Sequence, residues 1–228
     1  MTPRTSLAID YFSDVLCVWA YCGQIRIDEL CRAFGDRIAI RYRFLSVFGN
    51  TPRKIGAGWA ERGGFEGYAA HVSSVAARFP HVSAHAEAWA RVRPASSSAA
   101  HLFLKAVQLS EDSAAPAASG LLEKAIWATR CAFFGEARDV ATRPVQMEIA
   151  EQLGLSRSPI EAALDDGRAF AALCEDNEAQ LTQKIEGSPT LVFNEGRQKL
   201  YGNVGYRIIQ ANIEELLRTP DAQTGSWC

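Results

Sequence analysis

The sequence predicts an α/β protein in which a β-α-β unit and a closing β-β-α unit flank a large helical insertion. A strand-like stretch, apolar residues at helical spacing and a β-branched stretch follow one another over residues 7–48. Between about 67 and 179 the chain is mostly helix-forming. A sheet pattern returns at 189–201, and an amphipathic helix is expected at 206–217.

The first unit is expected to contain a strand over 7–12, a helix over 17–34 that stops at Gly35, and a second strand within 37–48. Asp14 is the expected N-cap of that helix. The two strands should be parallel, with a right-handed crossover. The glycine- and proline-rich stretch over 50–68 predicts loops, and six helices are expected after it: 68–79, 98–109, 120–134, 142–153, 159–165 and 167–181.

This pattern divides the chain into two expected parts. Residues 1–58 and 180–228 form one discontinuous domain, and residues 59–179 form the helical insertion subdomain. A flexible link is expected at 110–119, and the tail after Thr219 is expected to be disordered.

Composition and charge narrow the class of protein. The chain has 228 residues, is 48% hydrophobic and carries a net charge of −2. A balance this close to neutral gives no long-range attraction for nucleic acid or for an anionic membrane. The N-terminus lacks the apolar core of a secretory signal, and the longest uncharged apolar run, 15–25, is too short to span a bilayer. We expect a soluble cytoplasmic protein whose six cysteines are reduced.

Cys17 lies where the first strand-like run ends and the helical pattern begins. A thiol at the first turn of a helix faces unpaired backbone N–H groups and the positive end of the helix dipole. Both favour the thiolate, so Cys17 is predicted to be the chemical centre. The alternative is an inert buried thiol, which is also the expectation for Cys131 and Cys174.

Four motifs follow one another along the chain: S-D-V-L-C-V-W-A-Y, A-A-H-L-F-L-K-A, F-G-E-A-R-D-V-A-T-R-P and G-S-P-T-L-V-F-N. Together they resemble the DsbA branch of the thioredoxin superfamily, particularly its FrnE-type members and the related kappa-class glutathione transferases and 2-hydroxychromene-2-carboxylate isomerases. The resemblance covers residues 7–218 and implies a thioredoxin-like fold. It also implies a cis Ser188–Pro189 bond beside Cys17, with the backbone of Ser188 free to pair with a peptide or with glutathione.

The active-site motif departs from that of redox relatives, which carry a second cysteine three residues after the first. Here Ala20 occupies that position, and it is expected to contact substrate together with Trp19, Ser188, Pro189 and Asn203. In a regular helix Cys22 would lie roughly 8 to 9 Å from Cys17 between Cα atoms, beyond the usual reach of a disulfide of about 7 Å. Cys22 is therefore an alternative resolving thiol only if the first turn unwinds.

Other residues have weaker signals. Trp19 either walls a substrate cleft or packs in the core, and Asn203 occupies the region where kappa-class relatives hold glutathione. His101 is expected to make a structural hydrogen bond. The spacing of His81 and His85 would suit a metal pair, but nothing nearby completes a ligand set, so no metal site is predicted.

Three functions are compatible with these residues. The first is a monothiol thiol-disulfide oxidoreductase in which an external thiol such as glutathione resolves a mixed disulfide at Cys17. The second is a glutathione-dependent transferase or isomerase, and the third is a binding protein without catalysis. No tightly bound cofactor is expected, and glutathione is the expected co-substrate. Partners are expected to be a small thiol or disulfide or an extended peptide, and the relatives are often dimers, so a homodimer is expected.

Overall fold

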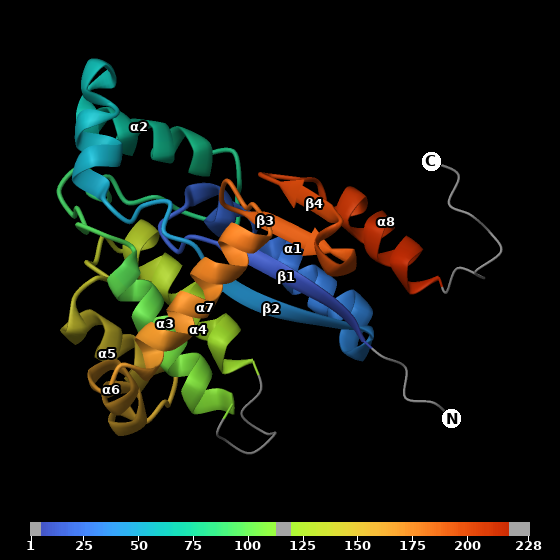
Figure 1. The fold of residues 1–228 in the computed structure, drawn as a ribbon. Coiled ribbons are helices and arrows are strands. Elements are labelled where there is room, and N and C mark those ends of the chain that lie inside the picture. The colour runs from blue at the N-terminus through green and yellow to red at the C-terminus, as the bar shows by residue number, and fades with distance from the viewer. Residues whose placement is uncertain (1–5, 113–119, 219–228) are drawn as a thin grey trace.

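The computed structural model describes residues 6–112 and 120–218 (Figure 1). Within these residues the sheet and the helices follow the predicted order. The strands and α-helices are β1 (Leu7–Ser13), α1 (Val18–Phe34), β2 (Ile38–Phe44), α2 (Gly64–Ala76), α3 (Ser98–Asp112), α4 (Leu121–Arg130), α5 (Arg143–Gln152), α6 (Arg157–Asp165), α7 (Arg168–Thr182), β3 (Thr190–Phe193), β4 (Gln198–Tyr201) and α8 (Tyr206–Leu217).

The strands form one mixed sheet in the order β2-β1-β3-β4. β1 and β2 are parallel and joined through α1, which is the predicted β-α-β unit. β3 runs antiparallel to β1 and pairs with β4 as a hairpin, and α8 then closes the chain. This topology puts the N-terminal end of α1 and the start of β3 at the same edge of the sheet, although some 170 residues separate them.

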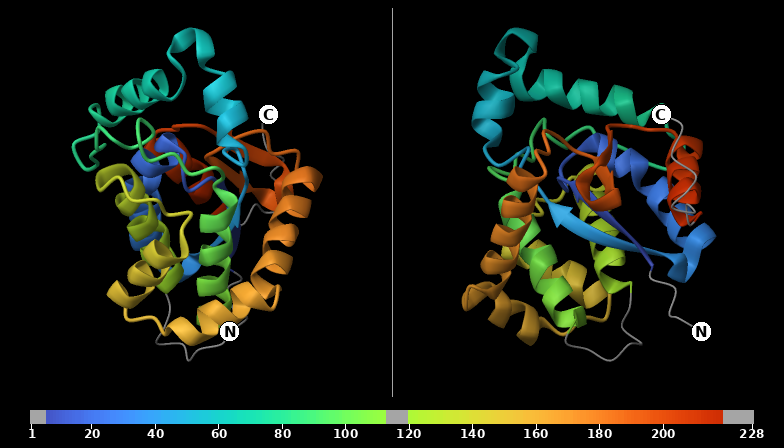
Figure 2. Two further views of the ribbon diagram at one scale, coloured as in Figure 1. Left: turned by 90° about the vertical axis from the view of Figure 1, so that its left-hand side faces the viewer. Right: turned by 45° about the vertical axis from the view of Figure 1, so that its right-hand side comes forward.

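The insertion lies mainly to one side of the sheet. Figures 1 and 2 show α3 to α7 gathered on that side and α8 on the opposite side, while α2 and the turns before it rise above both. The division at 58/59 and 179/180 stays a prediction.

A buried ion network attaches the insertion to β2. The Asp176 carboxylate on α7 accepts from Lys105 Nζ of α3 at 2.7 Å and from Arg43 Nη1 at 3.1 Å. It also accepts the backbone N–H of Phe44 at 2.8 Å. Because these groups come from α3, α7 and β2, the network fixes the end of β2 relative to two helices of the insertion.

Some predicted boundaries were wrong. The stretch expected to be loops contains a π-helical turn at Pro52–Ala57 and a 3-10 turn at Ala60–Arg62, and α2 already begins at Gly64. Proline is accepted in a first helical turn, and two glycines with positive φ, Gly63 and Gly64, let the chain change direction between turns.

The second strand ends at Phe44 rather than continuing to residue 48. α3 also continues to Asp112, so the first residues of the expected link over 110–119 are helical. Residues 113–119 and the tail after Thr219 lie outside the described residues. Within the described part of the chain, none of the helices has the length and apolar character needed to cross a membrane.

Candidate active site

Cys17 lies at the predicted junction between β1 and α1. It is the N-cap residue of α1, with extended backbone angles (φ −85°, ψ 115°), and its carbonyl accepts the first helical hydrogen bond from Tyr21 N at 3.0 Å. Its own N–H donates to the carbonyl of Asp14 at 3.1 Å. The expectation that Asp14 caps the helix was wrong, since the chain makes one more turn before α1 starts.

The Cys17 sulfur is almost enclosed, with the residue 6% exposed. Its thiol donates to the carbonyl of Ser188 at 3.3 Å, and the Ser188–Pro189 peptide bond is cis. Burial raises the pKa of Cys17, and the backbone N–H groups of Ala20 and Trp19 only partly oppose this. The expected thiolate is therefore not the resting form: desolvation outweighs the helix start, and the site holds a neutral thiol.

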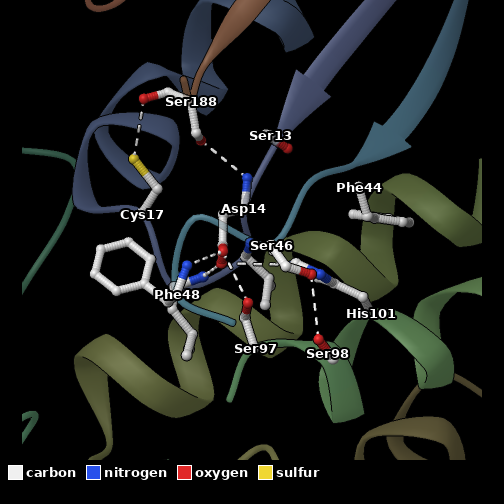
Figure 3. A network of polar contacts seen from close by, with 12 residues as sticks. Ser13, Asp14, Cys17, Phe44, Ser46, Phe48, Ser97, Ser98, His101 and Ser188 are labelled. Atoms are coloured by element: carbon white, nitrogen blue, oxygen red, sulfur yellow. Dashed lines mark hydrogen bonds and ion pairs between the residues drawn. The ribbon is translucent and has the colours of Figure 1, made fainter. Parts of the chain in front are cut away.

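Asp14 is the polar centre of this turn and is fully buried (Figure 3). One carboxylate oxygen accepts the N–H of Leu16 at 2.9 Å. The other accepts the N–H of Phe48 and the hydroxyl of Ser97, both at 2.8 Å. The N–H of Asp14 donates to Ser188 Oγ at 2.9 Å. Asp14 therefore ties the Cys17 turn to the loop after β2, to the start of α3 and to the cis-proline loop.

His101 makes the structural hydrogen bond that was expected of it. Its Nε2 accepts the N–H of Val15 at 3.1 Å, and its ring stacks on Phe44 with 5.2 Å between centroids. Nε2 also lies 3.5 Å from Asp14 Oδ1. The Val15 N–H points at Nε2, so this nitrogen acts as an acceptor and does not donate to Asp14.

A groove of about 380 Å³ opens beside the cis-proline loop. The guanidinium of Arg78 lies 5.2 Å from the centre of the Trp19 ring, and the ring of Phe79 meets Trp19 edge-on. Arg26 donates to the side-chain oxygen of Asn203. The groove is lined by Trp19, Arg78, Phe79, Ser188, Tyr201, Gly202 and Asn203.

Two further features shape this groove. Pro189 and Arg26 line a smaller pocket that adjoins it, since Trp19, Gly202 and Asn203 line both. The ring of Tyr201 lies against the backbone of Gly187, where an added Cβ would come within 2.5 Å of it. The structure thus brings Trp19, Ser188, Pro189 and Asn203 together, and Trp19 walls the groove rather than only packing in the core.

The other thiols offer Cys17 no ready partner. Ala20, in the resolving position of dithiol relatives, is fully buried. Cys22 is also buried. Its pKa is raised to about 11, mainly by burial and to a smaller extent by the nearby Cys17. Every cysteine in the described residues is free, and the Tyr21-to-Cys17 hydrogen bond keeps the first helical turn closed. Cys22 as a resolving thiol stays a prediction that would require this turn to open.

The remaining candidates have structural surroundings. His81 bonds the carbonyl of Cys22 at 3.0 Å, and His85 accepts from a nearby backbone N–H. No group of three metal-ligating side chains occurs within residues 6–112 and 120–218. Cys131 and Cys174 are half-buried rather than buried as expected.

Sequence reasoning missed Arg26, Arg78 and Tyr201. Arg26 follows Trp19 by seven residues, a spacing that places both on one face of α1, so it was detectable. Arg78 comes after the last residue of α2 and Tyr201 ends β4, and no periodic pattern points either side chain towards Cys17.

Solved structures share this fold. A 2-hydroxychromene-2-carboxylate isomerase aligns with 18% identity and a TM-score of 0.65, covering 93% of this chain and 97% of the other. A putative protein disulfide isomerase from Nitrosomonas europaea aligns with 21% identity and a TM-score of 0.68, over 96% and 100%. The cytosolic disulfide reductase DsbM from Pseudomonas aeruginosa, solved with GSH, aligns with 22% identity and a TM-score of 0.65, over 93% and 100%.

At these identities the likeness concerns the fold. Comparison with curated proteins gave no match. The model of the DSBA-like thioredoxin domain, however, matches residues 8–214, nearly the whole chain. The chain therefore belongs to the DSBA-like thioredoxin domain family, which includes thiol-disulfide oxidoreductases.

Proposed function

We propose that the protein is a cytoplasmic thiol-disulfide oxidoreductase that works through Cys17 alone, with glutathione as the external resolving thiol. The observation that carries the proposal is the contact of the Cys17 sulfur with the Ser188 carbonyl at 3.3 Å, beside a cis-proline. Ala20 leaves Cys17 without an intramolecular partner one turn away. A cytosolic disulfide reductase with the same fold supports the compartment.

The reaction has two exchange steps. The Cys17 thiolate attacks the glutathione sulfur of a mixed disulfide, which forms a Cys17–glutathione disulfide and releases the substrate as a thiolate. A second glutathione thiolate then attacks the glutathione sulfur of that disulfide. This forms oxidised glutathione and returns Cys17 as a thiolate, so in the sum of the two steps one external glutathione thiolate takes the place of the substrate thiolate in the disulfide.

The groove beside the cis-proline loop supports glutathione as the resolver. Glutathione carries two carboxylates, and Arg26 and Arg78 line the groove and its adjoining pocket. The amide of Asn203 is held in place by Arg26 and adds a neutral hydrogen-bonding group. A peptide-like anion therefore meets both positive charge and polar groups there.

The test is reduction of a glutathione mixed disulfide by purified protein, with Cys17→Ser as the variant. Activity should vanish in Cys17→Ser and persist in Cys31→Ser, which changes an exposed thiol on the same helix. Acid-quenched wild-type protein should contain glutathione on Cys17 by mass spectrometry. Full activity of Cys17→Ser would overturn the proposal.

Glutathione affinity provides a second measurement, by calorimetry. Arg78→Gln should weaken binding by about tenfold, the effect of losing one charge-assisted contact. Arg168→Gln, on an exposed arginine of α7 paired with Asp166, is the matched control and should bind as wild type does. No binding at millimolar glutathione would remove glutathione as the resolver.

One observation favours a second function, a glutathione-dependent transferase or isomerase. A neutral Cys17 thiol can donate a hydrogen bond to a bound glutathione thiolate, as it now donates to Ser188. A serine hydroxyl would do the same, so in this case Cys17→Ser would keep activity. A protein that neither exchanges disulfides nor binds glutathione would instead be a binding protein.

A further inference from the structure

We propose that Asp14 is a positioning residue for Cys17, whose buried carboxylate fixes the active-site turn and raises, through its charge, the pH at which Cys17 becomes a nucleophile. This deepens the proposed function and rests on Cys17 as its nucleophile. The role is separate from substrate binding, because Asp14 is fully buried and does not line the groove.

The geometry gives the carboxylate several neutral partners. Its two oxygens accept from Leu16 N at 2.9 Å, Phe48 N at 2.8 Å and Ser97 Oγ at 2.8 Å. Three donors of this kind satisfy an ionised carboxylate without cancelling its charge. His101 does not donate to the carboxylate, because its Nε2 accepts the Val15 N–H.

The backbone of Asp14 is also hydrogen-bonded to the Cys17 turn. The Asp14 carbonyl accepts the N–H of Cys17 at 3.1 Å. The Asp14 N–H donates to the hydroxyl of Ser188, and the carbonyl of Ser188 accepts the Cys17 thiol. Figure 3 shows Asp14 between the Cys17–Ser188 pair and the Phe48, Ser97 and His101 side. The negative charge and the sulfur are thus parts of one hydrogen-bonded unit.

The other groups that face Cys17 do not oppose this charge at neutral pH. Tyr11 of β1, Cys22 of α1 and Tyr68 of α2 interact electrostatically with Cys17, and burial raises the pKa of each. All three are therefore uncharged near pH 7. Asp14 itself acts on Cys17 in the direction that disfavours the thiolate.

The nearest cations interact with neighbours of Cys17 rather than with Cys17 itself. Arg26 and Arg78 interact with Cys22, and Arg130 of α4 interacts with Tyr11. On α3, Lys105 lies 5.5 Å from the Phe44 ring that stacks on His101, but its ammonium is paired with Asp176 at 2.7 Å. Arg130 is fully buried and also donates to the hydroxyl of Ser13, the residue before Asp14. Asp14 is nevertheless the charged group that acts on Cys17 itself.

The experiment measures the alkylation rate of Cys17 by iodoacetamide against pH, with fragment ions that distinguish Cys17 from Cys22. Asp14→Asn removes the charge and keeps one acceptor oxygen. The midpoint of the profile should fall by about one pH unit. At neutral pH the rate should rise about threefold rather than tenfold, because a less basic thiolate is a weaker nucleophile.

Two variants separate charge from simple loosening of the turn. Asp14→Glu keeps the charge and should keep the wild-type midpoint. Ser97→Ala removes one donor from the carboxylate, which leaves its charge less screened, so the midpoint should rise. Ser97→Ala also decides the question if Asp14→Asn does not fold.

An unchanged midpoint in Asp14→Asn would overturn the proposal. So would a midpoint that stays or falls in Ser97→Ala, since a loosened turn exposes the sulfur and favours the thiolate. Alkylation needs no turnover, so a protein without disulfide exchange would refute the proposed function while these profiles still judge the role of Asp14.

Discussion

Removing the charge of Asp176 should destabilise the protein by weakening the attachment of the insertion to the sheet. The carboxylate is fully buried, and the Lys105 side chain that bonds it is 4% exposed. Arg43 on the other side is 23% exposed. Asp176→Asn would keep an acceptor for the Phe44 N–H but leave the Lys105 ammonium buried without a counter-charge.

The magnitude follows from that unpaired cation. Removing one partner of a buried ion pair costs about 3 to 5 kcal/mol. Because Asp176→Asn keeps an acceptor, we expect a loss of about 3 kcal/mol in the free energy of unfolding. For a chain of this size the unfolding temperature should fall by about 6 to 12 °C. Glu161→Gln, which breaks an exposed pair between Glu161 and Arg157 on α6, is the control and should leave the temperature unchanged.

The pH dependence gives this prediction a sign. Burial lowers the pKa of Lys105, and Asp176 opposes that shift. Without Asp176 the folded-state pKa of Lys105 falls further, so above it the unfolded chain binds more protons and stability rises with pH. The difference in the free energy of unfolding between wild type and Asp176→Asn, measured by urea unfolding, should therefore become smaller from pH 7 to pH 10. A difference in unfolding temperature below about 1 °C, or a free-energy difference that does not become smaller, would refute the reasoning.

Two further substitutions test the site. Ala20→Cys places a thiol one helical turn from Cys17, at about 5 to 6 Å between Cα atoms. A disulfide should then form in air, measured as the loss of two free thiols. If Cys17 and the new thiol both stay free, the active-site alignment is contradicted. Gly187→Ala puts a Cβ within 2.5 Å of the Tyr201 ring, which is 67% exposed and can swing away. Glutathione affinity should then change severalfold by calorimetry, and an unchanged value would show that Tyr201 takes no part in the groove.

The placement of the site could be predicted because its parts are local signals. A cysteine between a strand pattern and a helix pattern, and a Ser-Pro entering a hairpin, are each readable from a few residues. The sheet order then brings Cys17 within 3.3 Å of Ser188 across 171 positions of sequence. Once the two units share one sheet, this contact follows from the topology.

The protonation state of Cys17 could not be predicted in the same way. The helix start was visible, but the groups that bury and surround the thiol come from segments without periodicity. Phe48 follows β2, Ser97 precedes α3, and both donate to Asp14. Likewise Pro52–Ala57 has the composition of a loop but forms a helical turn that packs against α2.

Burial of Cys17 and the alanine at position 20 have linked consequences for turnover. In the resolving step Cys17 must leave as a thiolate, and a thiol whose pKa is raised is a poor leaving group. In a dithiol relative the second cysteine attacks from within the same helix, at a high effective concentration. In the reaction proposed for this protein, the attacking thiol comes from solution through the groove beside Ser188. Binding in that groove must therefore supply the proximity that Ala20 cannot, and the resolving step should limit the rate. Because burial raises the pKa of Cys17, the proposed reaction also predicts slow oxidation of this thiol between turnovers.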